Sequence, residues 1–234
     1  MILYVNGDSH TAAAEAVNAH AFAEDDATLK HLGRIPHPDN LAVSWGKLLS
    51  KTLKATFHCN AESASSNARI LRTTRAWLQN CNYSSAEILL IIQWSTWERE
   101  EWLHNGTYYQ VGSSGIDHVP VELQEKYRNF VIGTDWQTKT QQAHEDIWQF
   151  HLELNQQNIP HVFFNGNNNF SRITNKKNWE KNYLAPYDPS MTYDSILKNN
   201  DIYTVAPDSW HFGRDGHSFF HRFMLQYIIA NKFI

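Results

Sequence analysis

Apolar and polar positions along the chain form blocks that predict strands and helices in alternation. Short apolar runs bounded by glycine or polar residues predict strands. The longest run, EILLIIQW, is almost unbroken, which is typical of a strand buried on both faces of a parallel sheet, so we expect it at the sheet centre. The predicted strands are residues 2–6, 56–59, 87–94 and 160–165, with a weaker candidate at 202–205.

Stretches between these runs have helical apolar spacing or consist of strong helix formers, and they predict helices. They are residues 11–23, 41–53, 67–78, 139–157 and 218–231, the last with Asp215 or Gly216 placed to cap it. Alternating strands and helices favour an open parallel sheet with helices on both faces. Ligands of such sheets bind at the carboxyl ends of the strands, so the functional residues are expected there.

Two stretches interrupt the alternation, and each follows the carboxyl end of a predicted strand. Residues 95–136 are rich in Trp, Tyr and Gly, and residues 167–190 are rich in Asn and Lys. We expect both to be insertions that lie as loops or small subdomains over the carboxyl edge of the sheet. Because no repeat and no linker divides the chain, residues 1–234 are predicted to form a single domain.

Composition narrows the class of protein. With 42% hydrophobic and 19% charged residues, the chain has enough apolar material to fold. The net charge of -4 lacks the basic excess that nucleic-acid binding usually needs, so no nucleic-acid partner is expected. Cys59 and Cys81 are too few for a disulfide scaffold and lack zinc-site spacing. No apolar run approaches the ~20 residues of a membrane span, and the start lacks the basic region of a signal peptide, so a cytoplasmic or otherwise non-secreted soluble protein is expected.

The first candidate for chemistry is the turn NGDSHT after the first predicted strand. A serine at the carboxyl end of a strand, beside a helix start, has backbone N–H groups around it that can hold an oxyanion. Ser9 is therefore a candidate nucleophile. The alternative is that Ser9 or Thr11 only caps the following helix.

A serine nucleophile needs a base and a carboxylate to orient that base. The segment DSWH supplies both, because Asp208 can hold one ring nitrogen of His211 while the other nitrogen faces Ser9. His217 and His221 are four residues apart on a predicted helix and resemble a metal pair. They lack a third nearby ligand, so no metal site is predicted.

These segments resemble one known family. GDSH at 7–10, NAESASSNARI at 60–70, and DSWH at 208–211 followed by GH are similar in sequence, order and spacing to the SGNH (GDSL-like) hydrolase superfamily. The resemblance implies a three-layer α/β/α, flavodoxin-like fold with about five parallel strands and a serine esterase site. It assigns Ser9 as nucleophile, His211 as proton acceptor and Asp208 as the orienting acid. It implies no metal and no organic cofactor.

The chain departs from the family at the oxyanion hole. Ala64 or Ser65 stands where the family usually has Gly, and QWSTWERE at 93–100 stands where it usually has GxND. The expected donors are the backbone N–H of Ser9, a backbone N–H near Ala64, and one side chain. Asn67, at the start of the third predicted helix, is the first choice, although it can instead cap that helix. The other candidates for this side chain are Gln93, Ser95 and Thr96.

Aromatic residues cluster after the central predicted strand, where flat rings can stack on sugars or contact an acyl chain. Trp94, Trp97 and Tyr108 are the candidate substrate-binding residues; the alternative is that they pack the insertion onto the domain. The sequence thus predicts a serine esterase that acts on a small-molecule or carbohydrate ester, such as an O-acetyl group. An O-acyltransferase with the same triad, or a catalytically weak glycan-binding or protein-binding module, are the alternatives.

Overall fold

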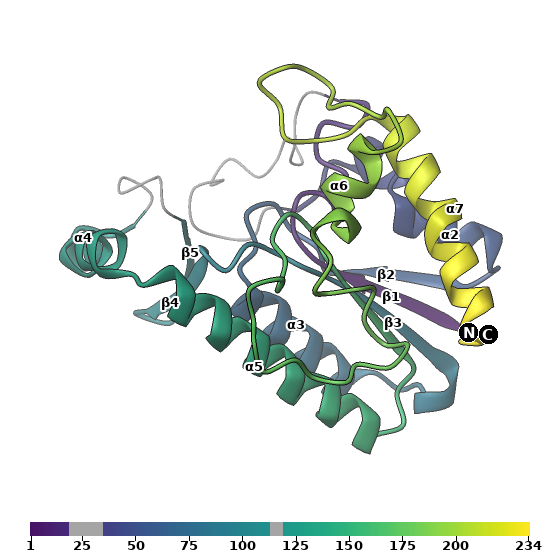
Figure 1. The fold of residues 1–234 in the computed structure, drawn as a ribbon, viewed down its shortest axis with the longest axis horizontal. Helices are drawn as coiled ribbons and strands as arrows, with labels where there is room; N and C mark the ends of the chain where they lie inside the picture. Colours follow the sequence, from purple (N-terminus) through teal and green to yellow (C-terminus); the bar gives the residue numbers. More distant parts are fainter. Residues whose placement is uncertain (19–34, 113–118) are drawn as a thin grey trace.

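A parallel sheet of four strands forms the centre of the protein (Figure 1). The computed structural model describes residues 1–18, 35–112 and 119–234. The strand order is β2-β1-β3-β6, which matches the first four positions of the flavodoxin-like order. The strands are β1 (Ile2–Asn6), β2 (Thr56–Cys59), β3 (Ile88–Trp94) and β6 (His161–Asn165).

All four strong strand predictions are confirmed, and β3 lies inside the sheet as expected. The weaker strand at 202–205 is wrong. Within the described residues this segment makes only an isolated antiparallel bridge between Thr204 and Phe212. The sheet therefore has four strands, where about five were expected.

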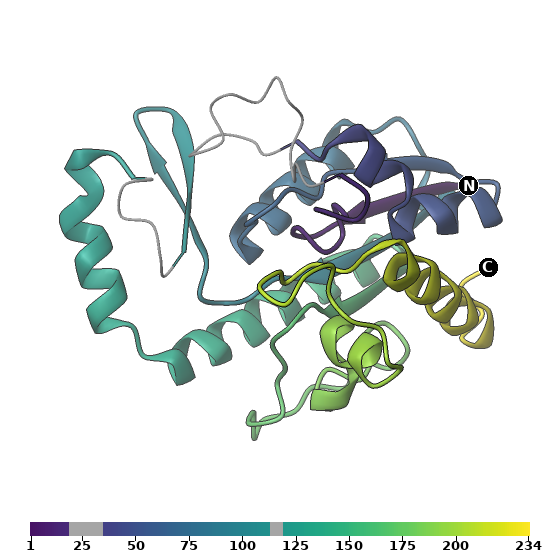
Figure 2. The ribbon, with the colours of Figure 1, turned by 90° about the horizontal axis from the view of Figure 1, so that it is seen from above.

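Helices cover both faces of the sheet, which gives three layers (Figure 2). Side chains alternate along β1, so Ile2 and Tyr4 face one layer while Leu3 and Val5 face the other. The first layer contains α3 (Asn67–Asn80) and α5 (Trp136–Gln156). The second contains α2 (Trp45–Thr52), α6 (Tyr193–Lys198) and α7 (Arg214–Ala230), and the short α1 (Pro38–Ala42) precedes α2.

Side-chain caps define where the helices begin. The hydroxyl of Ser66 accepts a hydrogen bond from the Arg69 N–H, so Ser66 rather than Asn67 caps α3. The carboxylate of Asp135 caps α5 in the same way. The N-cap of α7 is Gly213, so the prediction of a cap at Asp215 or Gly216 is wrong by two or three residues.

The predicted helix over 11–23 is wrong as far as residue 18, and residues 19–23 lie outside the described part. Residues 9–18 instead form a series of turns and bends. The Gln93 side chain accepts a hydrogen bond from the Thr11 N–H, so a contact with β3 holds the start of this segment. Ala13 and Glu15 also have φ of 57° and 62°, in the left-handed region that a right-handed helix cannot use.

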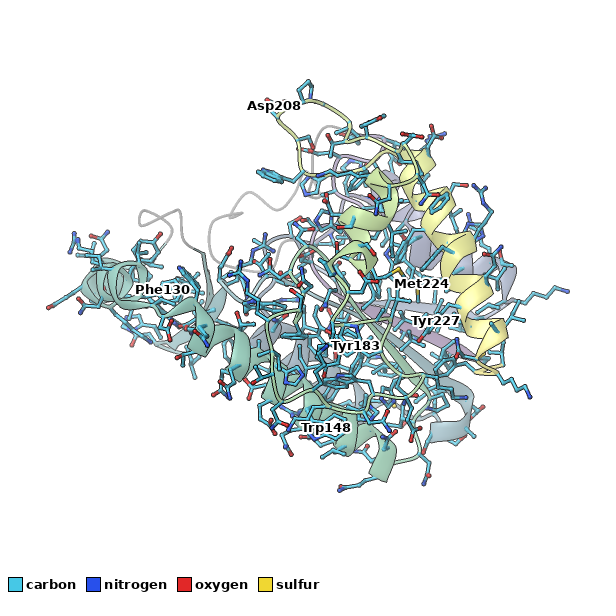
Figure 3. All side chains as sticks on the ribbon, in the orientation of Figure 1. Phe130, Trp148, Tyr183, Asp208, Met224 and Tyr227 are labelled. Carbon is cyan, nitrogen blue, oxygen red and sulfur yellow. The ribbon has the colours of Figure 1, made fainter. Side chains whose placement is uncertain are left out.

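The two stretches predicted as insertions differ in structure. The first contains an antiparallel hairpin, β4 (Glu100–His104) and β5 (Thr107–Val111), followed by α4 (Gln124–Gly133). Figures 1 and 3 show this unit beside the main body, with Phe130 in it. Its own small core consists of Trp102, Val111, Val119 and Tyr127. Single 3-10 turns occur at Ser85–Glu87, Val121–Leu123 and Pro189–Met191, the last at the end of the otherwise irregular second insertion.

Among the described residues, no helix is both long and apolar enough to cross a membrane.

Several histidines are buried in the two helical layers. His161 on β6 hydrogen-bonds the ring of His151 at 2.9 Å, and burial lowers its pKa to about 4. His217 on α7 accepts the Trp45 N–H at Nδ1, and burial, helped by His10 and His211, lowers its pKa to about 3. Both rings are therefore neutral in the folded protein at pH 7.

This burial predicts a loss of stability in mild acid. The unfolded chain takes up a proton at each histidine near pH ~6.5, whereas the folded chain does so only at the lowered pKa, so the free energy of unfolding falls as the pH drops through this window. Between about pH 7.5 and about pH 5, we expect His161 and His217 to cost about 2 kcal/mol each.

Urea unfolding at the two pH values measures this cost. The substitution His217→Asn keeps an acceptor for the Trp45 N–H but cannot be protonated, so it should remove about 2 kcal/mol from the pH dependence. An unchanged pH dependence in this variant would contradict the assignment.

Candidate active site

The carboxyl ends of β1 and β3 form the centre of the candidate site. The connection from β1 leads to β2 on one side, and the chain then returns to β3 on the other side, so the two loops diverge between β1 and β3. Ligand sites of open α/β sheets occur at such switch points. The chain places GDSH immediately after β1 and Ser95 immediately after β3.

Asp8, beside Ser9, is a buried carboxylate with a complete set of donors. Its Oδ1 accepts from Gln93 Nε2 at 2.7 Å, and from the His10 N–H at 3.0 Å. Its Oδ2 accepts from Ser95 Oγ at 2.8 Å and from Arg99 Nη1 at 3.1 Å. Burial by itself raises the pKa of Asp8, but the charges of His10 and Arg99 and the hydrogen bonds lower it overall. Asp8 is therefore ionised, and its hydrogen bonds link the turn after β1 to the end of β3.

Gln93 links the same turn from the other side. Its Oε1 accepts both the N–H and the hydroxyl of Thr11, at 3.1 and 2.7 Å, while its Nε2 donates to Asp8. A Cβ on Gly7 would lie 2.9 Å from Gln93 Oε1, and one on Gly166 would lie 2.5 Å from Gln93 Nε2. Two glycines thus make room for this side chain. Gln93 is a structural link: its Oε1 accepts two hydrogen bonds, and one hydrogen of its Nε2 is donated to Asp8.

Ser9 lies in this fastened turn and is 7% exposed. Its carbonyl accepts the Ala14 N–H at 3.0 Å, one of the bonds that coil the segment. The Ser9 hydroxyl makes no hydrogen bond with any residue that the structure describes. No direct bond to His211 is therefore present, although catalytic bonds of this kind often form only when substrate is bound.

The carboxylate of Glu15 binds His211 and holds it next to the segment that carries Ser9. Nδ1 of His211 lies 2.9 Å from Oε2 of Glu15, and the Ser209 hydroxyl donates to the same oxygen at 2.6 Å. Partial burial raises the pKa of Glu15, but these two hydrogen bonds outweigh that effect and lower it. An ionised carboxylate can only accept, so Nδ1 carries the proton and neutral His211 keeps a lone pair on Nε2. The ring of His211 lies 5.7 Å from the ring of His10.

Asp208 does not occupy the expected position. A turn with a hydrogen bond from the Ser209 N–H to the Ala206 carbonyl places Asp208 at the tip of the loop before α7 (Figure 3). Its side chain is exposed and makes no hydrogen bond or ion pair within residues 1–18, 35–112 and 119–234. The carboxylate that contacts His211 is that of Glu15.

The loop between β2 and α3 reaches the site through its backbone. The Glu62 N–H donates to the Gly7 carbonyl at 3.3 Å, so the loop runs beside the turn after β1. Ala64 has φ of 61°, the conformation that the expected glycine adopts without cost, and this supports the alignment of Ala64 with that position.

Of the side chains predicted as oxyanion donors, Asn67 and Ser95 bind each other. Asn67 Oδ1 accepts the Ser95 N–H at 2.9 Å, and Nδ2 donates to the Ser95 carbonyl at 3.2 Å, which leaves one amide hydrogen of Asn67. The Ser95 hydroxyl donates its only proton to Asp8. Thr96 is half-buried and contributes its carbonyl to the turn that ends at Arg99.

The three predicted substrate-binding aromatics have different environments. Trp94 is 1% exposed and packs on Phe150 and Phe163, so its assignment to substrate binding is wrong. Trp97 stacks on Phe170 with centroids 4.5 Å apart and lines a pocket. Tyr108 is 39% exposed on β5, with the Arg72 guanidinium 3.9 Å from its ring centroid.

Glu15 and Arg99 belong to the candidate site, and sequence reasoning missed them. Glu15 stands in an alanine-rich stretch that predicts a helix, and Arg99 stands in a charge run typical of a solvated face. One usable signal was the buried-strand context of Asp8, since a carboxylate there requires a cationic partner.

Within the described residues, no group of three or more His, Cys, Asp or Glu side chains is arranged to hold a metal ion. His217 contacts the Trp45 backbone, and His221 Nδ1 lies 2.9 Å from the Ser218 carbonyl, so the two rings have separate partners.

Comparison with known proteins identifies the family. The family described as "Family of unknown function (DUF6071)" matches residues 16–158. The chain belongs to this family. The matched range of DUF6071 includes Ala64, Asn67 and Gln93 but neither Ser9 nor His211.

No curated protein matches the sequence. Among solved structures, the psychrotrophic esterase EstA from Pseudoalteromonas sp., inhibited by monoethylphosphonate, is similar over 98% of this DUF6071 chain and 97% of its own. The two chains are 13% identical, with a TM-score of 0.41.

The Asp8 network makes Gln93 the side chain on which the turn after β1 depends. We expect Gln93→Met, which keeps the length but removes the amide, to lower the free energy of unfolding by about 3 kcal/mol, because Asp8 and Thr11 lose partners in a buried place. Gln79→Met on the exposed face of α3 should change it by less than about 0.5 kcal/mol. Equal effects in urea unfolding would show that the network contributes nothing.

Proposed function

We propose that the protein is a serine esterase in which Ser9 is the nucleophile, His211 the general base and Glu15 the acid that orients His211. The observation that carries the proposal is the hydrogen bond between His211 Nδ1 and Glu15 Oε2. Glu15 is six residues after Ser9 in the sequence. This bond favours the imidazole tautomer that can accept a proton at Nε2. It also holds the ring next to the segment that carries Ser9.

The reaction follows from these groups. His211 Nε2 takes the proton of the Ser9 hydroxyl as Oγ attacks the ester carbonyl carbon, and the Glu15 carboxylate stabilises the imidazolium. The imidazolium then protonates the leaving alcohol oxygen as the C–O bond breaks. Water then attacks the acyl carbon while His211 Nε2 takes its proton. The bond between this carbon and Ser9 Oγ breaks, the ring returns the proton to Oγ, and the carboxylic acid leaves.

The oxyanion needs donors aimed at the carbonyl oxygen during the attack. The backbone N–H of Ser9, a backbone N–H of the loop at Ala64, and the remaining amide hydrogen of Asn67 are the donors that we assign. The strand ends support this assignment, because the loop at Ala64 is bonded to Gly7, and Asn67 is bonded to Ser95 beside Asp8.

Ser9→Ala should abolish hydrolysis of p-nitrophenyl acetate, with a loss of at least about 10³-fold, since no other group supplies the attacking oxygen. Ser190→Ala, at an exposed serine of the second insertion, should retain full activity. A fluorophosphonate probe should label Ser9 in the wild-type protein, as located by mass spectrometry. Activity or labelling that survives in Ser9→Ala would end the proposal.

If the acyl group passes to a sugar hydroxyl in preference to water, product analysis will show a transferred ester, and the protein is an acyltransferase with the same residues. If the folded wild-type protein shows neither turnover nor labelling, the binding-module alternative holds.

The two carboxylates near His211 make opposite predictions. Glu15→Gln should lower kcat/KM by about 10²- to 10⁴-fold, because an amide can hold the ring in the wrong tautomer. Asp208→Asn should leave kcat/KM within about threefold, since its side chain is exposed at the loop tip. The ¹⁵N chemical shifts of His211 give a readout that does not need activity: the Nδ1–H form should dominate in wild type and Asp208→Asn, and decrease in Glu15→Gln. The reverse pattern would restore Asp208 as the orienting acid.

A further inference from the structure

A pocket separate from the candidate active site lies at the carboxyl edge of the sheet, beside the end of β6. It has a volume of about 610 Å³, within the usual range of small-molecule sites. One wall is the first part of α5, from Trp136 to Glu145, and the other is the loop at 167–177 that follows β6. We call it the β6 pocket. None of Ser9, His211 or Glu15 lines it.

The loop wall of the β6 pocket is firmly held by the Tyr187 hydroxyl. This oxygen accepts the Lys177 N–H at 2.6 Å and the Trp179 Nε1–H at 2.8 Å, and it lies 2.9 Å from His144 Nε2 on α5. With two donors on the oxygen, its single proton can be donated to His144 Nε2 or to the Lys177 carbonyl, 3.3 Å away. Trp97, which also lines the pocket, is held by stacking on Phe170 at an interplanar angle of 11°.

Charges in the β6 pocket largely cancel. Lys177 Nζ pairs with Glu145 Oε2 at 2.9 Å, and this bond lowers the pKa of Glu145, so both groups are charged and mutually neutralised. Burial lowers the pKa of His144, which is therefore neutral. Arg172 is exposed and makes no ion pair within the described residues. The pocket thus offers one guanidinium in an otherwise neutral surface.

Side-chain amides and hydroxyls supply most of the remaining polar lining. Asn167, Asn168, Asn175 and Gln141 border the pocket, and their side chains make no hydrogen bond with any other residue in the described part of the chain. Each amide is both a double donor and an acceptor, which matches the mixed donor and acceptor character of vicinal hydroxyl groups. The 42% exposed indole of Trp136, at the rim, adds a flat apolar face.

We propose that the β6 pocket binds a neutral carbohydrate. Its size, its free amides and its exposed indole suit a ligand with a ring that is apolar on its face and rich in hydroxyl groups at its edge. A phosphate-type anion fits less well, because one cation is already paired with Glu145 and the anion would leave the amide acceptors facing negative oxygens.

The β6 pocket adjoins the candidate active site through Trp97. This side chain also lines the neighbouring hollow that Asn67 and Arg99 border, and those two residues bind Ser95 and Asp8 next to Ser9. A saccharide in the β6 pocket would therefore extend along the same sheet edge. Its binding does not require Ser9; only the further step, that the bound sugar carries the ester, rests on the proposed function.

Binding is tested with the Ser9→Ala protein, so that it is measured apart from any turnover. Saturation-transfer NMR and calorimetry with maltohexaose, cellohexaose, xylohexaose and chitohexaose should detect at least one ligand at millimolar concentration or below. Trp136→Ala should weaken that binding by about tenfold or more. Tyr83→Ala, at a similarly exposed aromatic outside the pocket, should leave it unchanged.

Three results would overturn the proposal. They are no binding of any of the four oligosaccharides, binding that Trp136→Ala leaves intact, and binding of inorganic phosphate that Arg172→Gln abolishes while the sugars do not bind. Failure of Ser9 labelling in the wild-type protein would remove the esterase proposal and leave sugar binding standing.

Discussion

The buried carboxylate of Asp8 is the constraint on which the candidate site depends. An unpaired charge in this position would cost several kcal/mol, so the folded state must bring donors to it. Those donors come from β3 and the residues after it, namely Gln93, Ser95 and Arg99. The turn after β1 is thereby fastened across the sheet edge to the start of the first insertion, and the switch point becomes a fixed junction.

This junction lies next to the segment after Ser9, where the sequence predicts a helix and the structure has turns. Gln93 binds the Thr11 N–H, and the alanine-rich segment after Ser9 then coils through turns, with Ala13 and Glu15 at positive φ. That path brings the Glu15 carboxylate to 2.9 Å from His211 Nδ1.

The insertions add surfaces around this junction in two ways. The first has a small core of its own and is tied to α3 by the bidentate pair between Arg72 and Glu101, at 2.7 and 2.6 Å. The second has almost no regular structure and is held instead by the Tyr187 hydroxyl and by the packing of Phe170 and Trp179 on α5 side chains. The side-chain amides of Asn167, Asn168 and Asn175 take no part in these contacts within the described residues, so they remain available to a ligand.

The sequence by itself determined the four strands and the helices α2, α3, α5 and α7, because apolar runs such as EILLIIQW and helical spacing over 67–78 and 139–157 depend on local periodicity. It also singled out Ser9, His211 and the glycine-like position at Ala64, since these belong to short motifs at strand ends. Tertiary structure alone decided which carboxylate meets His211 and which aromatics are accessible. Glu15 and His211 are 196 residues apart. Trp94 and Trp97 are both buried in the layer of α3 and α5, but of the two only Trp97 also lines the β6 pocket. Contacts of this range depend on how loops pack over the sheet, and no local pattern encodes them.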